Sequence, residues 1–133
     1  MLAPGTLWTI GHSTLPIDEF VDSLYGHGVT HVVDVRRFAG SRAYPQFNPE
    51  PLAQSLESAG ITYSALPGLG GRRKPDPASR HVAWRNDAFR GYADYMDTPE
   101  FAAAATELAA VAREDRVAIL CAEAVWWRCH RSM

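Results

Sequence analysis

Titratable side chains stand where apolar runs of the sequence end, and their types suit proton transfer and anion binding. His12, the pair Asp34 and Arg36, and Glu123 all occupy such positions. Imidazole and carboxylate groups act as general acids and bases near neutral pH. A guanidinium group binds carboxylates and phosphates through two parallel hydrogen bonds. The set predicts a polar site in which His12 and Glu123 move protons and Arg36 holds an anion.

Each of these residues also has a purely structural interpretation. His12 could cap the following helix or face solvent. Asp34 and Arg36 lie two residues apart and therefore on one face of a strand, where they could simply form an ion pair. Such pairs perturb pKa values without taking part in catalysis. Glu123 requires only a partner or water, so both interpretations stay open at this point.

The two cysteines differ in their surroundings. Cys121 closes an apolar run, which is typical of a buried and unreactive thiol. Cys129 lies between Arg128 and His130, and cationic neighbours lower the pKa of a thiol and increase its reactivity. Cys129 is therefore a candidate nucleophile, and the two thiols could form a redox pair. Seven residues separate them, which is not the spacing of a zinc knuckle, so we predict no metal site.

A glycine-rich stretch offers a second way to bind an anion. Residues 66–74 read LPGLGGRRK, and backbone N–H groups there, together with Arg72, could contact a phosphate. The stretch is not a P-loop, since no Gly-Lys-Ser/Thr ending opens a helix. From residue 72 to residue 90, six basic side chains accompany two acidic ones, and Trp84 and Tyr92 could stack on bases. The segment predicts a surface for single-stranded nucleic acid or, more simply, a solvated loop.

These candidate residues need a frame that brings them together, and the alternation of two patterns predicts one. Four nearly continuous apolar runs are typical of strands buried on both faces of a parallel sheet; they cover residues 7–10, 30–35, 61–66 and 117–121. Apolar residues at helical spacing lie between them, over residues 17–28, 48–60, 89–96 and 98–112. This alternation predicts an α/β fold with an open, mainly parallel sheet and helices on both faces.

In such sheets ligands bind at the carboxyl ends of the strands, which is where the candidate residues would meet. Two long connections, residues 38–47 and 67–86, follow the second and third strands. Long loops in a compact domain are usually functional or mobile. The chain stops at Met133, soon after the last strand. We therefore expect a single domain over residues 1–133 that is shortened at its C-terminus, where a helix and strand would be missing.

Length and composition exclude several classes of protein. The 133 residues suit one domain, and 47% hydrophobic with 21% charged residues exclude a disordered chain. No apolar run approaches the ~20 residues of a membrane helix, and the N-terminus lacks the basic start of a secretory signal. Two cysteines are too few for a disulfide-rich secreted protein. We expect a cytoplasmic protein without membrane contact. Its net charge of −2 gives no overall attraction to nucleic acid.

Several short motifs occur in an order that resembles the DUF488 family. They are TIGHS at 9–13, VDVR at 33–36, Ser41-Arg42, Tyr63 with LPGLGG at 66–71, YADYM at 92–96, and CAE at 121–123 followed by CHR at 129–131. The resemblance covers nearly the whole chain and implies a small cytoplasmic α/β protein, in a family without an assigned function. It also implies that members continue past the CHR motif with a further helix and strand.

We interpret the chain as a candidate enzyme whose arginine-rich pocket binds a nucleotide or a nucleic-acid phosphate at the carboxyl edge of the sheet. The candidate catalytic residues are His12, Glu123 and Cys129. The candidate ligand-binding residues are Ser13, Asp34, Arg36, Ser41, Arg42, Gly70, Gly71, Arg72, Cys121, His130 and Arg131. No cofactor is predicted, and the sequence does not specify an oligomeric state. Two alternatives stay open: a non-catalytic nucleic-acid-binding module using residues 72–90, and a thiol redox protein using Cys121 and Cys129.

Overall fold

The computed structural model describes residues 7–12, 14–36, 39–40, 42–71, 73–83 and 87–121. Its strands are β1 (Leu7–Gly11), β2 (His31–Asp34), β3 (Thr62–Ala65) and β4 (Val117–Cys121). Its helices are α1 (Ile17–Gly26), α2 (Pro49–Ser58), α3 (Asp87–Met96) and α4 (Pro99–Glu114), with short 3₁₀ turns η1 (Pro45–Phe47) and η2 (Pro67–Leu69). The predicted strand–helix alternation is confirmed. The predicted loss of a C-terminal helix and strand concerns the chain beyond Cys121, outside the described residues.

The four strands form one open sheet in the order β1–β4–β2–β3, and every pair is parallel. The register places Gly11 of β1 opposite Cys121 of β4, and Asp34 of β2 opposite Leu120 of β4. The carboxyl ends of these strands therefore reach the same edge of the sheet. No helix within the described ranges is long and apolar enough to cross a membrane.

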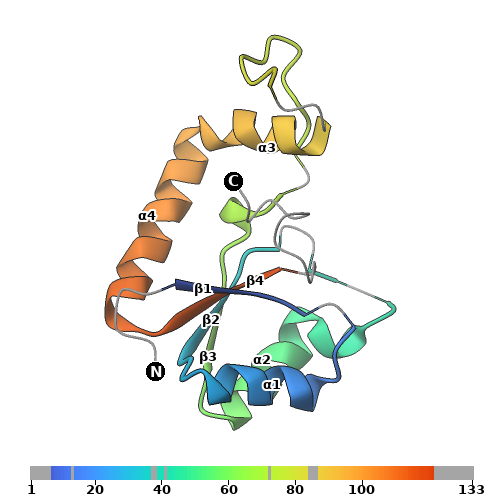
Figure 1. The fold of residues 1–133 in the computed structure, drawn as a ribbon, viewed down its shortest axis with the longest axis vertical. Coiled ribbons are helices and arrows are strands. Elements are labelled where there is room, and N and C mark those ends of the chain that lie inside the picture. The colour runs from blue at the N-terminus through green and yellow to red at the C-terminus, as the bar shows by residue number, and fades with distance from the viewer. Residues whose placement is uncertain are drawn as a thin grey trace.

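The strand order decides which face each helix covers. The connections from β1 to β2 and from β2 to β3 run in the same direction across the sheet, whereas the connection from β3 to β4 runs back. Such crossovers are right-handed. A helix in a connection that runs one way across the sheet therefore covers one face, and a helix in a connection that runs the other way covers the opposite face. Accordingly, α1 and α2 lie on one side of the sheet and α4 lies on the other (Figure 1). The prediction of helices on both faces is confirmed.

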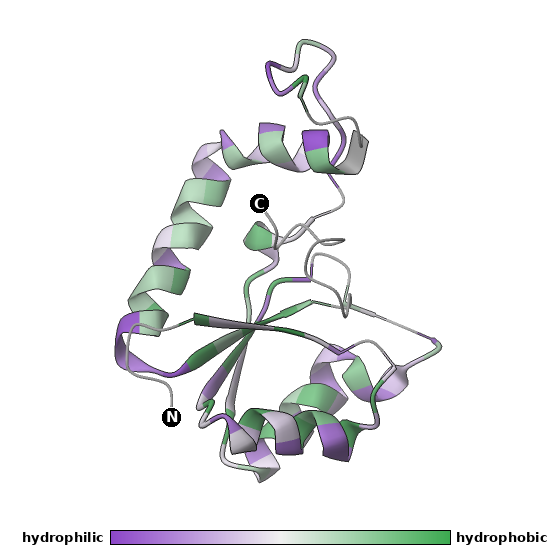
Figure 2. Ribbon diagram, in the orientation of Figure 1, coloured by the Kyte–Doolittle hydropathy of each residue, from purple (hydrophilic) through white to green (hydrophobic). Residues whose placement is uncertain are grey.

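Each face of the sheet has its own apolar core. On the first face, α1 and α2 pack on alternate strand residues; this core includes Phe20, Leu24, Val32, Phe47, Leu52, Leu56, Ala118 and Leu120. On the second face, the smaller side chains of α4 pack on the intervening strand residues; this core includes Val33, Val35, Leu69, Ala104, Ala112 and Val117. The centre of the sheet is predominantly hydrophobic in consequence (Figure 2). Burial on both faces explains the nearly continuous apolar runs of the central strands β2 and β4. The edge strands β1 and β3 are largely exposed or half-buried, so the expectation that all four strands are buried on both faces is wrong for these two.

The helices end where the sequence places glycine. Gly28 follows α1 with a φ of 71° and Gly60 follows α2 with a φ of 77°, a left-handed conformation that side-chain-bearing residues rarely adopt. Helix α4 begins at a Thr-Pro pair, where the Thr98 hydroxyl accepts a hydrogen bond from the Phe101 N–H at 3.3 Å. These local signals therefore determine where the helices between the strands begin and end.

Candidate functional site

The neighbouring strands β2 and β3 form a topological switch point at their carboxyl ends. The chain leaving β2 leads to α2 on one face, whereas the chain leaving β3 leads to α4 on the opposite face. In open α/β sheets ligands bind at such a point, because the two connections diverge and leave a crevice outside the strand ends. Asp34 and Arg36 lie at the end of β2, so the fold places them at this position.

Asp34 and Arg36 form a buried, bidentate ion pair. The Nε of Arg36 donates to Asp34 Oδ1 at 2.8 Å, and Nη2 donates to Oδ2 at 2.6 Å. The backbone N–H of Arg36 also donates to Oδ1 at 3.1 Å. The side chains are only 2% (Asp34) and 5% (Arg36) exposed. The ion pair that alternation along the strand suggested is therefore present, and it is shielded from solvent.

Two further groups complete the hydrogen bonding of this pair. The hydroxyl of Tyr63, from β3, donates to Asp34 Oδ2 at 2.6 Å. Nη2 of Arg36 donates a second hydrogen bond to the carbonyl oxygen of Phe47 at 2.8 Å. Asp34 thus accepts four hydrogen bonds, which is about the capacity of a carboxylate. The network joins β2, β3 and η1 into one rigid unit.

The protonation states of the network follow from burial and from Asp34. Burial lowers the pKa of the Arg36 guanidinium, but the hydrogen bond and negative charge of Asp34 outweigh it and raise the pKa above its ordinary value. Burial raises the pKa of the Tyr63 phenol, and its hydrogen bond to Asp34 raises it further. Arg36 therefore stays charged and Tyr63 stays a neutral donor at neutral pH.

His12 joins this region through Phe47. Its buried imidazole stacks on the Phe47 ring, with ring centroids 4.3 Å apart and an interplanar angle of 16°. Its backbone N–H donates to the Cys121 carbonyl at 3.0 Å, one position beyond the β1–β4 ladder. His12 and Arg36 consequently contact the same residue, one at its ring and the other at its carbonyl. The structure brings these two predicted site residues together.

Cys121 lies on the other face of the sheet. Its neighbour Leu120 stands opposite Asp34 and belongs to the core under α1 and α2. Because successive side chains of a strand alternate between faces, the Cys121 thiol is directed to the face that α4 covers. The thiol is buried there. Cys121 is thus separated by the sheet from the Asp34–Arg36 pair with which the sequence analysis grouped it.

Apart from Gly70 and Gly71, which belong to the glycine-rich segment, the remaining predicted residues divide into two groups. Arg42 lies exposed in the connection between β2 and η1. The others lie outside the described residues and stay predictions; they are Ser13, Ser41, Arg72, Glu123, Cys129, His130 and Arg131. In the part of the chain that the structure describes, no three histidine, cysteine, aspartate or glutamate side chains lie close enough to hold a metal ion.

The glycine-rich segment 66–71 is held by donors that bind its carbonyl groups. The hydroxyls of Tyr92 and Tyr95 donate to carbonyls of this segment at 2.8 and 2.7 Å, and Nε of Arg73 donates to another at 3.1 Å. The backbone N–H of Gly70 donates within the η2 turn at 2.9 Å. Gly70 therefore does not offer the N–H that the predicted anion contact requires. Gly71 is half-buried at the end of the same segment.

Helix α3 also fixes the chain that follows this segment. The guanidinium of Arg73 lies over the Tyr95 ring, 3.6 Å from its centroid. Gly91 permits the close approach, because a Cβ at this position would lie 1.9 Å from the Arg73 carbonyl oxygen. Asp94 accepts hydrogen bonds from the Ser79 hydroxyl at 2.6 Å and from a backbone N–H of the loop at 2.7 Å. The described part of the loop is thus docked on the helix.

Carboxylates of α3 and of the turn after it reduce the positive charge of the basic segment. Asp97 accepts hydrogen bonds from Arg80 Nε and Nη2 at 3.2 and 2.8 Å, and His81 Nε2 lies 2.8 Å from the same carboxylate. The hydrogen bonds from Arg80 and His81 lower the pKa of Asp97 to about 2. Asp94 and Asp97 lie just beyond residues 72–90. The excess of basic side chains within residues 72–90 is therefore larger than the local positive charge that a phosphate would meet.

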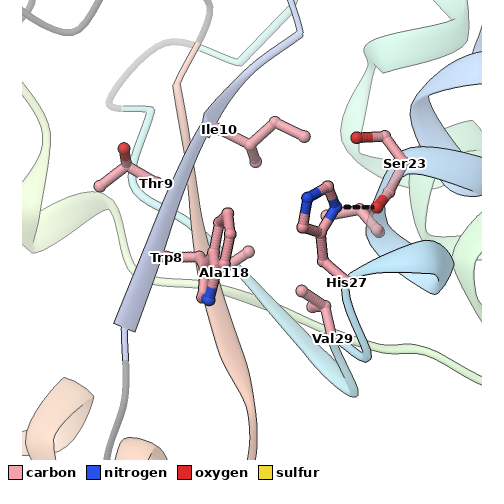
Figure 3. Close-up of a pocket in the computed structure, with 8 residues that line it drawn as sticks. Trp8, Thr9, Ile10, Ser23, His27, Val29 and Ala118 are labelled. Carbon is pink, nitrogen blue, oxygen red and sulfur yellow. Dashed lines mark hydrogen bonds between the residues drawn. The ribbon is translucent and has the colours of Figure 1, made fainter. Parts of the chain in front are cut away.

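A cavity of about 140 Å³ lies between β1 and α1, away from the Asp34–Arg36 pair. Trp8 and His27 face each other across part of it with ring centroids 4.7 Å apart, and His27 Nδ1 donates to the Ser23 carbonyl at 2.7 Å (Figure 3). None of the predicted site residues is among those that line it. The cavity is therefore separate from the site at the carboxyl ends of β2 and β3.

Sequence reasoning left two members of the network out of the predicted site. Tyr63 lies on β3 opposite Val32 and faces the same side of the sheet as Asp34, so alternation along two adjacent strands could have located it. Phe47 contributes through its backbone carbonyl and the face of its ring, and residue type alone carries no signal for such a role.

Comparison with known proteins gives one family. The model of the family described as "Domain of unknown function DUF488" matches residues 16–133. The matched range begins after the TIGHS string at 9–13 and includes Asp34 and Arg36. No curated protein and no solved structure matches the chain. The resemblance seen in the sequence is confirmed, and the chain belongs to the DUF488 family, a domain of unknown function.

Proposed function

We propose that this DUF488 protein is an enzyme that binds an anionic ligand, a nucleotide or another phosphate-bearing molecule, at the carboxyl ends of β2 and β3. The observation that carries the proposal is the buried Asp34–Arg36 pair at the topological switch point of the sheet. Ligand sites of open α/β sheets occur at such points. Arg36 is the residue type best suited to a carboxylate or phosphate ligand.

The energetics of the pair favour a role beyond stability. Burying two charges costs several kcal/mol of desolvation for each ion, and well-packed apolar residues often give equal or greater stability. Arg36 directs Nε and Nη2 at Asp34 and at the Phe47 carbonyl, and its guanidinium also interacts with the Tyr63 side chain. We assign to the ligand the Nη1 group, the guanidinium nitrogen that is bound to neither Asp34 nor Phe47. Asp34 holds it in a fixed orientation.

Neighbouring residues supply further charge and a proton carrier. Arg42 is exposed in the same connection as Phe47 and is the second positive charge that we assign to the ligand. His12 reaches the site at the end of β1, stacked on Phe47, and an imidazole can donate or accept a proton near neutral pH. We therefore assign anion binding to Arg36 and Arg42 and proton transfer to His12. Glu123 and Cys129 stay candidate catalytic residues from the sequence.

Calorimetric titration with inorganic phosphate and with a nucleoside monophosphate tests the binding proposal. Arg36→Lys keeps the charge but loses the fork geometry, so we expect affinity to fall at least about tenfold, equivalent to about 1.4 kcal/mol. Arg80→Lys is the matched control, because Arg80 is exposed and bound to Asp97. Absence of binding by the wild-type protein, or equal affinities of the two variants, would contradict the proposal.

A second variant separates binding from folding. If Arg36→Lys does not fold, Arg42→Gln still removes a charge from the proposed site, at an exposed position. We expect this variant to keep the wild-type unfolding temperature and to bind phosphate severalfold more weakly. Unchanged phosphate affinity in folded Arg42→Gln protein would remove Arg42 from the site.

The two alternatives drawn from the sequence receive less support. Arg80 is engaged by Asp97 and Arg73 lies over Tyr95, so both are occupied within the chain rather than presented to a nucleic acid. A thiol redox pair needs Cys129, outside the described residues, and Cys121 is buried in the face that α4 covers. The site at the carboxyl ends of β2 and β3 is therefore the stronger proposal.

A further inference from the structure

Three hydrogen-bonded polar side chains connect the amino end of β2 with β3 and with the turn before β4. His31 is the first residue of β2, Ser64 lies on β3, and Asp115 lies in the turn between α4 and β4. His31 Nε2 is 2.7 Å from Ser64 Oγ, and His31 Nδ1 is 3.0 Å from Asp115 Oδ2. The three residues are far apart in sequence and are brought into hydrogen-bonding distance by the fold.

The direction of the hydrogen bonds follows from the chemistry of the partners. An ionised carboxylate can only accept a hydrogen bond, so Asp115 requires the proton of His31 on Nδ1. In the neutral imidazole, Nε2 then carries a lone pair, and the 2.7 Å contact is a hydrogen bond that the Ser64 hydroxyl donates to it. A nucleophile, a base and an orienting carboxylate in this order are the arrangement that activates a serine.

The three side chains differ in their exposure to solvent, and the differences suit activation of a serine. The His31 side chain is 8% exposed, and the Asp115 side chain is 44% exposed. Ser64 is half-buried on β3, which is the last strand of the sheet in the described residues. The base is therefore shielded from water, while the nucleophile lies at an edge that a small substrate can reach.

The same edge supplies a hydrogen-bond donor for a developing oxyanion. The N–H groups of Thr62 and Leu66 donate to the carbonyls of Thr30, just before β2, and Asp34, at its end, at 3.0 and 2.8 Å. In a parallel ladder the intervening residues direct their N–H groups to the other side of the strand. Tyr63 and Ala65 therefore present these groups at the outer side of β3, where the described residues form no further strand. The Ala65 N–H directly follows the nucleophile and could donate to the substrate oxygen.

We propose that Ser64, His31 and Asp115 form a second site, one that hydrolyses short acyl esters. Ser64 Oγ forms a bond to the acyl carbon and passes its proton to His31 Nε2. The ester C–O bond breaks, and the leaving alcohol takes that proton. A water molecule then attacks the acyl carbon of the acyl-serine. His31 Nε2 takes a proton from this water and passes it to Ser64 Oγ as the acyl–serine bond breaks, and a carboxylic acid is released. Ester and water are thereby converted to alcohol and acid, and the enzyme is restored.

This site is independent of the anion site. Ser64 pairs with Val33, and Val33 belongs to the core beneath α4. Tyr63 pairs with Val32, and Val32 belongs to the core beneath α1 and α2. The two adjacent residues therefore serve different faces of the sheet. Loss of ester hydrolysis would leave the phosphate-binding proposal untouched, and the reverse also holds.

Covalent labelling of the full chain by a fluorophosphonate probe tests the nucleophile. Such probes phosphonylate activated serines, and mass spectrometry of the labelled peptides identifies the residue modified. We expect label on Ser64 and none in the Ser64→Ala variant. Ser79→Ala is the matched control and should label as the wild type does, because the Ser79 hydroxyl donates directly to Asp94 without an intervening histidine. No labelling of the wild type, or equal labelling of Ser64→Ala, would overturn the proposal.

Substitutions of Asp115 test its positioning role without disturbing a buried residue. Asp115→Asn should slow both labelling and p-nitrophenyl acetate hydrolysis roughly hundredfold, since the amide no longer fixes the proton on Nδ1. Asp115→Glu should recover a large part of both rates. Equal unfolding temperatures of the two variants would show that the fold is intact. Wild-type rates in folded Asp115→Asn protein would overturn the assignment of the carboxylate and, with it, of the site.

Discussion

The two ends of strand β2 hold polar clusters of different kinds. At the carboxyl end, Asp34 and Arg36 form a buried ion pair in which Asp34 accepts four hydrogen bonds. Toward the amino end, the His31 imidazole is hydrogen-bonded both to the Ser64 hydroxyl and to the half-exposed Asp115 carboxylate. We infer that the first cluster fixes the orientation of the Arg36 guanidinium, whereas the second transfers the proton of the Ser64 hydroxyl. Strand β3 joins both clusters, through adjacent residues directed to opposite faces.

The largest difference should emerge when the charged cluster is broken. Arg36→Ala leaves the Asp34 carboxylate buried without its partner, which typically costs about 3–5 kcal/mol in the free energy of unfolding. Arg80→Ala is the control, because it removes an exposed ion pair and should leave the midpoint of urea unfolding close to that of the wild type. Equal midpoints for the two variants would show that the buried pair does not stabilise this end of β2.

A second substitution tests whether α3 holds the segment that follows β3. Gly91→Ala forces a Cβ against the Arg73 carbonyl oxygen, where only 1.9 Å is available, and an overpacked backbone contact should cost about 3 kcal/mol. Gly26→Ala provides the control, since a Cβ there meets nothing within 4 Å and alanine favours the helix. Thermal unfolding should rank Gly91→Ala well below Gly26→Ala, and the opposite order would contradict the close docking of this segment.

Adjacent residues of β3 allow the two clusters to be compared directly. Tyr63→Phe removes a hydrogen bond to the Asp34 carboxylate and should cost about 2 kcal/mol, in the range for bonds to charged groups. Ser64→Ala removes a hydrogen bond between a hydroxyl and an imidazole, in which no carboxylate takes part, and should cost about 1 kcal/mol. Urea unfolding of both single variants measures the difference. A larger loss for Ser64→Ala would reverse our ranking of the two clusters.

The smallest expected effect concerns an exposed counterpart of the buried pair. Hydrogen bonds from Arg80 and His81 lower the pKa of Asp97 in the folded protein to about 2, below its ordinary value of 3.8. A lowered pKa in the folded state means that Asp97 contributes stability above pH 3.8, and that this contribution disappears as pH falls toward 2. The difference in unfolding free energy between wild type and Asp97→Asn should therefore shrink between pH 5 and pH 2. A constant difference would contradict the pairing.

Several features of this fold were predictable because their signals are local. The continuous apolar runs marked all four strands, and Gly28 and Gly60 marked the ends of two helices through backbone conformations that glycine adopts readily. Strand alternation placed Asp34 and Arg36 on one face, and the structure shows them paired there. Each of these inferences depends on residues within one turn or one strand of each other.

Other features depended on which strands and loops became neighbours. The same alternation could not say that Cys121 would lie across the sheet from Arg36, because that relation is decided by the order β1–β4–β2–β3. Counting charges along residues 72–90 omitted Asp97, since the carboxylate that pairs with Arg80 lies beyond that segment. His31 meets Ser64 after 33 positions and Asp115 after 84.

The sequence by itself determined the elements, their alternation and the side chains available at the strand ends, because periodicity and turn chemistry act over a few residues. Only the tertiary structure decided partners: Arg36 with Phe47, Asp34 with Tyr63, and His31 between Ser64 and Asp115. The physical reason is that hydrogen bonding and burial require atoms within a few ångströms of each other. Distance between residues remote in sequence is set by strand order and by which face each helix covers.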